Sequence, residues 1–179
     1  MQPLRLLVVG GSLGARAINE LVPQALAKLS PDERPEVVHQ TGEKNFLATC
    51  DNYTRLKVTA TIKPFIDNMA EAYAWADVVL CRAGALTIAE LCTVGLGAIL
   101  VPFPYAVDDH QTANALFMVR NNAAELIQQA DLTVDKLAEL LKELSIQREK
   151  CYGMAQSAYK SRKINAAESV LKICEEICQ

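Results

Sequence analysis

Residues 4–15 read Leu-Arg-Leu-Leu-Val-Val-Gly-Gly-Ser-Leu-Gly-Ala, an apolar run that ends in a glycine-rich turn. The apolar part has the length and the Val and Leu content of a strand covered on both faces. Residues 15–29 continue with helical periodicity. A strand, a tight turn and a helix in this order form the first half of a βαβ unit and predict a parallel sheet.

The same alternation of strand-length and helical segments continues to about residue 130. Right-handed crossovers would join these segments into an α/β fold, a Rossmann-like doubly wound parallel sheet. Strands are expected at residues 4–9, 36–40, 55–59, 77–81, 98–102 and 124–127. Helices are expected between them at residues 15–29, 44–50, 68–75, 86–94 and 110–120.

After residue 130 the strand-like runs stop and the pattern becomes helical. Helices are expected at residues 134–144, 147–160 and 166–178. Thr133 is expected to cap the first of them, because its hydroxyl can accept a hydrogen bond from a helix amide. The sequence therefore predicts one domain over residues 1–179, with the sheet within about residues 4–130 and a helical tail over residues 131–179.

The composition is that of a globular protein: 179 residues, 51% hydrophobic and 22% charged, with a formal net charge of −3. This charge gives no general electrostatic reason to bind nucleic acid or an anionic membrane. The longest uncharged stretch, residues 91–107, contains two glycines and two prolines, so we expect no membrane-spanning helix. The N-terminus has no signal-peptide pattern, and export is not expected.

The cysteines and histidines do not form a metal-binding pattern. None of the six cysteines belongs to a CxxC pair, and His39 and His110 lie far apart in the sequence. We therefore expect reduced, cytoplasmic thiols and no protein-bound metal.

The turn at residues 10–15 follows the first strand and opens the first helix, where unpaired backbone amides attract an anion. A nicotinamide-dinucleotide fingerprint would require a glycine at Ser12 and an acidic residue after His39-Gln40. A Walker A loop would require Gly-Lys-Ser/Thr, which is missing here. The turn is a candidate diphosphate site, and a tight turn that only packs the helix is the alternative.

A second strand–turn–helix junction follows residues 77–81. The amides of Ala85, Leu86 and Thr87 lie where a helix N-terminus would meet phosphate oxygens. Two such turns on one sheet suggest a diphosphate bound between them. Glu90, about one and a half turns further along the helix, could accept both hydroxyls of a ribose. Its alternative is a solvated surface carboxylate.

A polar cluster at residues 108–114 follows the fifth strand. Open α/β sheets bind ligands at the carboxyl ends of their strands, which is where this cluster is expected. Asp109, His110 and Gln111 could exchange hydrogen bonds with sugar hydroxyls. The alternative is that Asp109 caps a surface helix.

Taken in order, five segments resemble the MurG family, bacterial transferases that add N-acetylglucosamine from UDP-N-acetylglucosamine to the lipid-linked muramoyl-pentapeptide (lipid I) of peptidoglycan synthesis. They cover nearly the whole chain. The segments are GGSLGAR at 10–16, HQTG at 39–42, PFIDNM at 64–69, ADVVLCRAGALTIAE at 76–90 and DDHQTANA at 108–115. Gly97 departs from the pattern, where we expect proline, and should change the stiffness of the turn.

The resemblance implies a GT-B glycosyltransferase, in which two Rossmann-like lobes face a cleft. This chain corresponds to the C-terminal, donor-binding lobe. The N-terminal lobe, which would bind lipid I and supply the candidate general base, is missing from it. The final helix of the family returns to pack on that lobe. The full-length enzyme would be peripheral on the cytoplasmic side of the bacterial inner membrane, and this fragment soluble and inactive.

The resemblance also implies contacts with the nucleotide. Ser12 and the amides of Ala85, Leu86 and Thr87 would lie near the UDP diphosphate. Ile66 would meet uracil through its backbone. Glu90 would bind the ribose hydroxyls.

For the sugar and the leaving group, the resemblance implies a second set of contacts. His110 and Gln111 would contact N-acetylglucosamine hydroxyls, with Asn114 nearby on the same helix. Arg82 is a candidate to stabilise the departing diphosphate. The reaction would be a direct displacement with inversion, with no cofactor and no catalytic base in this chain.

Two other functions are compatible with the same segments. A GT-B-like UDP-N-acetylglucosamine epimerase would share this nucleotide-binding half, although the GGS, FID and RAGALT segments favour the transferase. A stand-alone module that binds nucleotide sugars without catalysis is the other alternative, which the length of the chain does not exclude.

Overall fold

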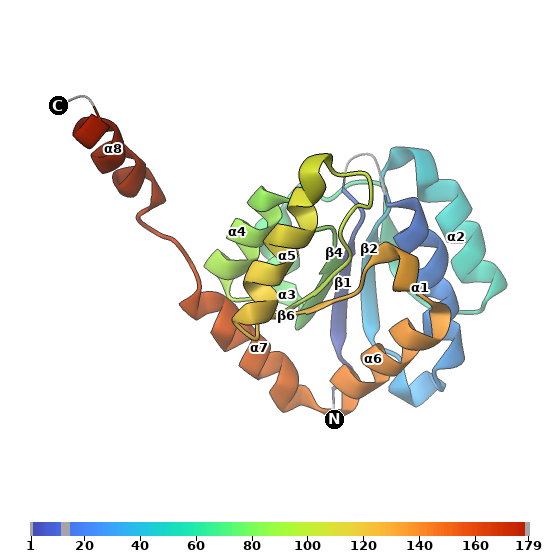
Figure 1. Cartoon of the computed structure of the whole chain (residues 1–179). Helices are drawn as coiled ribbons and strands as arrows, with labels where there is room; N and C mark the ends of the chain where they lie inside the picture. Colours follow the sequence, from blue (N-terminus) through green and yellow to red (C-terminus); the bar gives the residue numbers. More distant parts are fainter. Residues whose placement is uncertain (1, 12–14, 178–179) are drawn as a thin grey trace.

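A computed structural model describes residues 2–11 and 15–177 and shows a parallel sheet between two layers of helices (Figure 1). The predicted fold class is confirmed. The six strands lie in the order β3-β2-β1-β4-β5-β6. They are β1 (Arg5–Val9), β2 (Glu36–Gln40), β3 (Thr61–Lys63), β4 (Val78–Cys81), β5 (Ala98–Leu100) and β6 (Ala124–Leu126).

The strand order reverses at β1, which pairs with β2 on one side and β4 on the other. In open parallel sheets a ligand crevice forms at such a switch point, beyond the carboxyl ends of the strands. The register brings three of these ends to one level, because Val9 lies opposite both Gln40 and Cys81. The turns that follow these three strands therefore begin side by side.

Each face of the sheet is covered by an apolar helical layer. In β1, Leu6 and Val8 belong to the core on one face of the sheet, whereas Leu7 belongs to the core on the other face. This two-sided burial explains why the strands read as continuous apolar runs. The helices of the domain are α1 (Arg16–Lys28), α2 (Phe46–Arg55), α3 (Met69–Trp75), α4 (Ala85–Val94), α5 (His110–Arg120), α6 (Val134–Ile146) and α7 (Arg148–Lys160). Short 3-10 turns lie at Pro31–Glu33, Glu43–Asn45, Val107–Asp109 and Gln129–Asp131.

The prediction of a strand at residues 55–59 is wrong. The helix expected to end at residue 50 continues through Arg55, because Thr49 and Tyr53, one turn apart, both face the interior. The third strand follows at Thr61–Lys63. It is a short edge strand of mostly exposed residues, so its sequence lacks the apolar run that marks the other strands.

Gly97 has a steric role that its sequence position did not indicate. A Cβ atom at this residue would lie 2.7 Å from Cβ of Met154, on α7. Real Cβ atoms do not approach one another so closely, so glycine allows α7 to pack against the start of β5. This close approach gives Gly97 a steric reason in this fold, and its effect on the stiffness of the turn stays a prediction.

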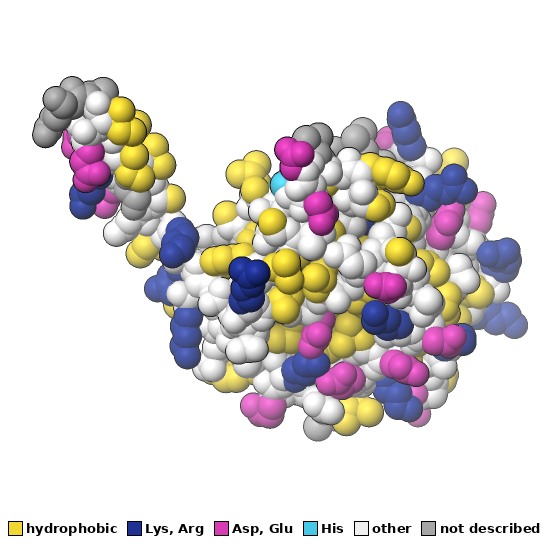
Figure 2. Space-filling view, viewed as in Figure 1, with side chains coloured by type: hydrophobic (Ala, Val, Ile, Leu, Met, Phe, Trp, Pro, Cys, Tyr) yellow, Lys and Arg dark blue, Asp and Glu magenta, His cyan; other side chains and the backbone are white. Residues whose placement is uncertain are grey.

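The helical tail is confirmed, and its last helix stands apart. Thr133 caps α6 as predicted, since its hydroxyl accepts a hydrogen bond from the Lys136 amide at 3.2 Å. After α7 an extended segment leads to α8 (Ala166–Ile177), which projects from the body of the domain (Figure 1). Apolar side chains line one side of α8 in Figure 2, and those of Val170, Ile173 and Ile177 are more than half exposed. Within residues 2–11 and 15–177, no helix combines the length and the apolar character needed to cross a membrane.

Candidate functional site

The glycine-rich turn after β1 is held close to α1 and to the end of β2. A Cβ atom at Gly10 would lie 3.0 Å from the Ala15 nitrogen and 3.1 Å from the Gln40 carbonyl oxygen, so the backbone leaves little room for a side chain. Gly11 has a φ of +76°, a conformation that favours glycine. Close packing thus explains Gly10, and the positive φ explains Gly11. Ser12 lies outside the described residues, and its role at the diphosphate stays a prediction.

The turn after β4 leads directly into the N-terminus of α4. In the described part of the chain, no side chain caps this helix at Gly84. The Ile88 amide makes the first helical bond, to the Gly84 carbonyl at 3.0 Å, so the amides of Ala85, Leu86 and Thr87 have no partner within the helix. The Leu86 side chain is 80% exposed. This helix N-terminus therefore presents open donors and the positive end of a helix dipole to a ligand.

Arg82 places a fixed positive charge beside that turn. Its Nη1 donates to the carbonyl oxygens of Val101 and Pro102, both at 3.0 Å, and its Nη2 donates to Oε1 of Gln129 at 2.6 Å. The guanidinium carbon also lies 5.5 Å from the centre of the Phe103 ring. Burial lowers the pKa of Arg82, but a guanidinium remains charged in proteins.

A pocket of about 530 Å³ brings the first turn and Arg82 together. Gly10 and Ala15 line it on one side, and Arg82, Phe103 and Gln111 on the other. Because β1 and β4 are neighbours, this pocket lies at the switch point of the sheet. Arg16 and Glu20, which form an ion pair, line it as well, so a diphosphate group here would meet the fixed charge of Arg82 with one paired carboxylate nearby.

Two predicted sugar-binding residues on α5 also support the backbone of the second turn. Oε1 of Gln111 accepts from the amides of Ala83, at 3.3 Å, and Phe103, at 3.0 Å. Nδ2 of Asn114 donates to the Ala83 carbonyl at 3.0 Å. Because its oxygen already has two partners, Gln111 could offer a sugar hydroxyl only its amide nitrogen. Sequence reasoning missed this supporting role.

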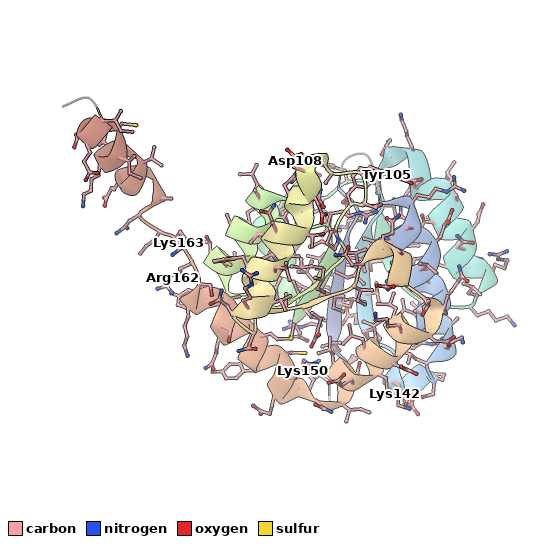
Figure 3. All side chains as sticks on the ribbon, viewed as in Figure 1. Tyr105, Asp108, Lys142, Lys150, Arg162 and Lys163 are labelled. Carbon is pink, nitrogen blue, oxygen red and sulfur yellow. The ribbon has the colours of Figure 1, made fainter. Side chains whose placement is uncertain are left out.

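The loop between β5 and α5 forms the rim of the same edge. Tyr105 and Asp108 lie at this end of the molecule, and Lys142 and Lys150 at the opposite end (Figure 3). Asp109 occupies the N-cap position of α5, but its carboxylate accepts from the Thr112 hydroxyl at 2.7 Å. No cap bond from this side chain to a helix amide occurs among the residues that the structure describes, so the simple capping alternative is wrong. His110, the first residue of α5, is exposed.

The predicted uracil contact lies across β2 from the diphosphate pocket, after β3. The Ile66 side chain is buried, whereas the neighbouring Phe65 is 59% exposed. Both line a hollow of about 410 Å³ with Lys63, Asn68 and Trp75. Within the described ranges no hydrogen bond occupies the Ile66 backbone, which is the group expected to meet uracil.

Glu90 is exposed, as the surface-carboxylate alternative requires, and it also has a partner on α3. Its Oε2 accepts from the Tyr73 hydroxyl at 2.9 Å. Burial, reinforced by the Glu90 charge, raises the pKa of Tyr73, so the hydroxyl stays protonated and donates. The structure thus holds Glu90 in place on the side of α4 that meets α3. Nothing in the local sequence pattern pointed to Tyr73.

The predicted residues therefore fall into two groups at one edge of the sheet. Arg82, Gln111 and Asn114 surround the turn after β4, and Ile66 and Glu90 lie on the side of α3. Sequence reasoning missed their protein partners Tyr73 and Gln129, and also Gln40, which binds the first turn. Within the described ranges, no three His, Cys, Asp or Glu residues cluster in a way that could hold a metal ion.

Comparison with known proteins gives one consistent result. The model of the glycosyltransferase family 28 C-terminal domain matches residues 5–170. The UDP-N-acetylglucosamine–N-acetylmuramyl-(pentapeptide) pyrophosphoryl-undecaprenol N-acetylglucosamine transferase of Marinobacter nauticus is 53% identical over 173 residues, which are 97% of this chain and 48% of that protein. The transferase of the same name from Acidovorax sp. is 50% identical over 177 residues, 99% of this chain and 44% of the relative. The chain thus spans about half the length of the curated relatives it matches.

Solved structures extend the comparison to the fold. The crystal structure of Acinetobacter baumannii MurG superposes with a TM-score of 0.89 at 41% identity, covering 98% of this chain and 52% of the other. The glycosyltransferase VinC in complex with dTDP gives a TM-score of 0.65 at 17% identity, covering 97% of this chain and 41% of that one. The second match shows a shared fold only.

Proposed function

The chain belongs to the family of glycosyltransferase family 28 C-terminal domains, and we propose that it is the donor-binding half of an inverting glycosyltransferase. The whole enzyme would transfer N-acetylglucosamine from UDP-N-acetylglucosamine to lipid I, forming lipid II in peptidoglycan synthesis. One observation carries this proposal: the uncapped N-terminus of α4 and the fixed charge of Arg82 lie at the switch point of the sheet. The names of its relatives supply the reaction.

In the proposed complex the diphosphate lies between the two turns. The amides of Ala85, Leu86 and Thr87 donate to its oxygens, and Ser12 contacts it from the first turn. The acceptor hydroxyl attacks the anomeric carbon while the bond from that carbon to the UDP oxygen breaks, and UDP leaves with the electron pair. Arg82 stabilises the charge that grows on UDP, because protein groups already fix its guanidinium and little reorganisation is needed.

The rest of the donor fixes the geometry of the attack. The Ile66 backbone binds uracil, and Glu90, held by Tyr73, accepts from the ribose hydroxyls. His110, Gln111 and Asn114 lie nearest the sugar. These contacts hold the anomeric carbon in place, while the general base and lipid I come from the N-terminal half. The whole enzyme would be peripheral on the cytoplasmic face of the inner membrane.

The proposal is tested first by binding. Calorimetry on the purified chain should show binding of UDP and UDP-N-acetylglucosamine, with weaker binding of CDP as the control for uracil recognition. No sugar should be transferred to lipid I, because the proposal assigns acceptor binding to the N-terminal half. A folded chain that binds neither uridine ligand would overturn the proposal, and transfer by this chain alone would overturn its assignment as a half.

A chimera tests the reaction itself. Fused to the N-terminal half of the Marinobacter nauticus relative, the chain should support transfer to lipid I. A folded chimera that binds the donor but transfers nothing would favour the stand-alone binding module. Conversion of UDP-N-acetylglucosamine to its 2-epimer would instead favour the epimerase.

A further inference from the structure

Gln40 belongs to the HQTG segment at residues 39–42, to which the proposed function gives no role. It is the last residue of β2 and is 3% exposed. Its strand lies between β1 and β3, so its neighbours on the two sides are the turn after β1 and the segment after β3. The first is the proposed diphosphate turn, and the second leads to Ile66.

The Gln40 side chain hydrogen-bonds both segments at once. Its Oε1 accepts from the Gly11 amide at 3.0 Å, and its Nε2 donates to the Gly11 carbonyl at 3.1 Å. The same Nε2 donates to the Pro64 carbonyl, also at 3.1 Å. Both amide hydrogens are therefore used, and a flipped amide would face like groups at every contact.

A backbone hydrogen bond of Gln40 itself and the buried contacts of its neighbour His39 fix the position of Gln40. The Gly10 amide donates to the Gln40 carbonyl at 2.9 Å. The neighbouring His39 is fully buried, with Nε2 3.0 Å from Oδ1 of Asn19 and Nδ1 2.9 Å from the Tyr53 hydroxyl. Since α1, α2 and β2 are joined through His39, the end of β2 is a rigid support for both segments.

We propose that Gln40 is a positioning residue that sets the distance between the diphosphate turn at Gly11 and the uracil segment at Pro64. A nucleoside diphosphate is then bound at both ends by preformed groups, without an ordering cost at binding. This inference rests on the proposed function for the identity of the ligand. The link between the two segments itself rests only on the contacts of Gln40.

The experiment replaces Gln40 by methionine, Gln40→Met, which keeps the length of the side chain and removes all three hydrogen bonds. Affinities for uridine, inorganic pyrophosphate and UDP are measured by NMR titration or calorimetry. UDP affinity should fall about ten-fold, whereas the affinities for uridine alone and for pyrophosphate alone should each fall less than about three-fold. The variant loses the advantage of binding two linked groups to two sites at a fixed distance. If Gln40 only stabilised the fold, the affinity for UDP would not fall more than the affinities for uridine and pyrophosphate.

Amide hydrogen exchange without ligand provides a second measurement. The Gly11 amide, which donates to Gln40, and the Gly42 amide, which donates to the Pro64 carbonyl at 3.1 Å, should exchange at least about ten-fold faster in the variant, with β4 and β5 unchanged. If Gln40→Met does not fold, Gln40→Glu replaces it, since the carboxylate retains an acceptor for Gly11 but loses both donors. Asp77→Ala, a substitution at the opposite edge of the sheet, is the matched control for lost stability.

The outcomes separate the two proposals. Unchanged exchange at both amides, or equal weakening of UDP and of its two parts, would overturn the role of Gln40. A wild-type chain that does not bind UDP would overturn the proposed function, and the exchange measurement would still decide whether Gln40 links the two segments.

Discussion

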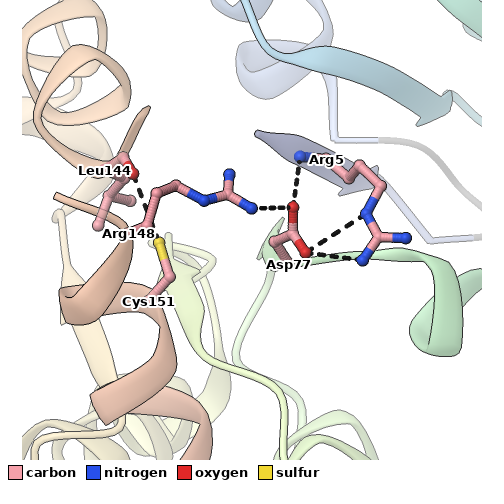
Figure 4. A network of polar contacts seen from close by, with 5 residues as sticks. All are labelled: Arg5, Asp77, Leu144, Arg148 and Cys151. Atoms are coloured by element: carbon pink, nitrogen blue, oxygen red, sulfur yellow. Dashed lines mark hydrogen bonds and ion pairs between the residues drawn. The ribbon is translucent and has the colours of Figure 1, made fainter. Parts of the chain in front are cut away.

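The amino ends of the parallel strands form one edge of the sheet, here called the amino edge, and their carboxyl ends form the opposite carboxyl edge. The two edges use polar side chains in opposite ways. At the amino edge Asp77 lies between Arg5 and Arg148, and its carboxylate forms an ion pair with each of them (Figure 4). At the carboxyl edge Gln40, Gln111 and Asn114 instead bind the backbones of turns. Paired charges at the amino edge hold β1, β4 and α7 together and offer a ligand little. At the carboxyl edge the turns are ordered by these bonds, and the amides of Ala85, Leu86 and Thr87 at the start of α4 remain for a ligand, which is the difference that identifies the site.

The amino-edge network is ionised at neutral pH. Oδ1 of Asp77 is 2.8 Å from Nη2 of Arg5, and its Oδ2 is 2.6 Å from Nη2 of Arg148. Burial alone would raise the pKa of Asp77, but the hydrogen bonds from Arg5 and Arg148 outweigh it, and the pKa is lowered. The nearby Cys151 thiol, which contacts the Leu144 carbonyl, has its pKa raised by burial.

The largest effect on stability is expected at the amino edge. Asp77→Ala removes a carboxylate with two arginine partners and leaves those charges unpaired, so the free energy of unfolding should fall by about 2–3 kcal/mol. UDP affinity should stay within about two-fold of wild type, because no proposed ligand contact lies at this edge. Urea denaturation and calorimetry measure the two quantities. A clear loss of UDP affinity in the folded variant would show that the two edges are coupled.

The sequence predicted this fold well where burial leaves a pattern. β1, β2, β4 and β5 are covered on both faces and therefore read as apolar runs, and they lie where we predicted them, within a few residues at their ends. The edge strand Thr61–Lys63 has only polar or partly exposed positions, and it was misplaced for that reason.

The site was predictable in a more limited sense. The two turns could be placed from sequence, because an anion site made of backbone amides depends only on where a strand ends and a helix begins. The side-chain partners could not be predicted from sequence, because the Tyr73–Glu90 and Arg82–Gln129 contacts join residues from separate elements. Only the packing of α3 on α4, and of the Gln129–Asp131 turn beside β5, brings them together. The ligand contacts implied by family resemblance stay predictions.

The buried His39, which supports the end of β2, should make the free energy of unfolding depend on pH. Burial lowers the pKa of His39 to about 3, whereas an unfolded histidine titrates near 6.5. Below about pH 6.5 the unfolded chain thus binds a proton that the folded chain excludes, and stability is lost as the pH falls toward 3. Between pH 7 and pH 5 the loss should be about 2 kcal/mol, measured by urea denaturation.

A matched variant isolates this effect. His39→Gln keeps a polar side chain beside Asn19 and Tyr53 but does not titrate, so its stability should change much less over the same pH range. An equal slope in wild type and variant would assign the dependence to other groups.

At the carboxyl edge, Glu90→Ala should weaken UDP binding about ten-fold, equivalent to about 1.4 kcal/mol, through loss of charge-assisted bonds to the ribose. Folding should be little affected. Tyr73→Phe is the companion variant, because it keeps the carboxylate and removes only the hydroxyl that positions it. Calorimetry should place its UDP affinity between those of wild type and Glu90→Ala. Equal affinity in all three proteins would return Glu90 to the role of a surface carboxylate.

The smallest effect tests whether Gln111 contacts the sugar or only supports the turns. If its amide nitrogen donates to a hydroxyl of N-acetylglucosamine, Gln111→Ala should weaken UDP-N-acetylglucosamine binding a few-fold more than UDP binding, since one neutral hydrogen bond contributes about 0.5–1.5 kcal/mol. Its oxygen also holds the amides of Ala83 and Phe103, so some loss for both ligands is expected. Gln111→Glu separates the two roles, because it keeps that acceptor and removes the nitrogen donor. Selective weakening of UDP-N-acetylglucosamine in Gln111→Glu would support the sugar contact, and equal weakening of both ligands would limit Gln111 to holding the turns.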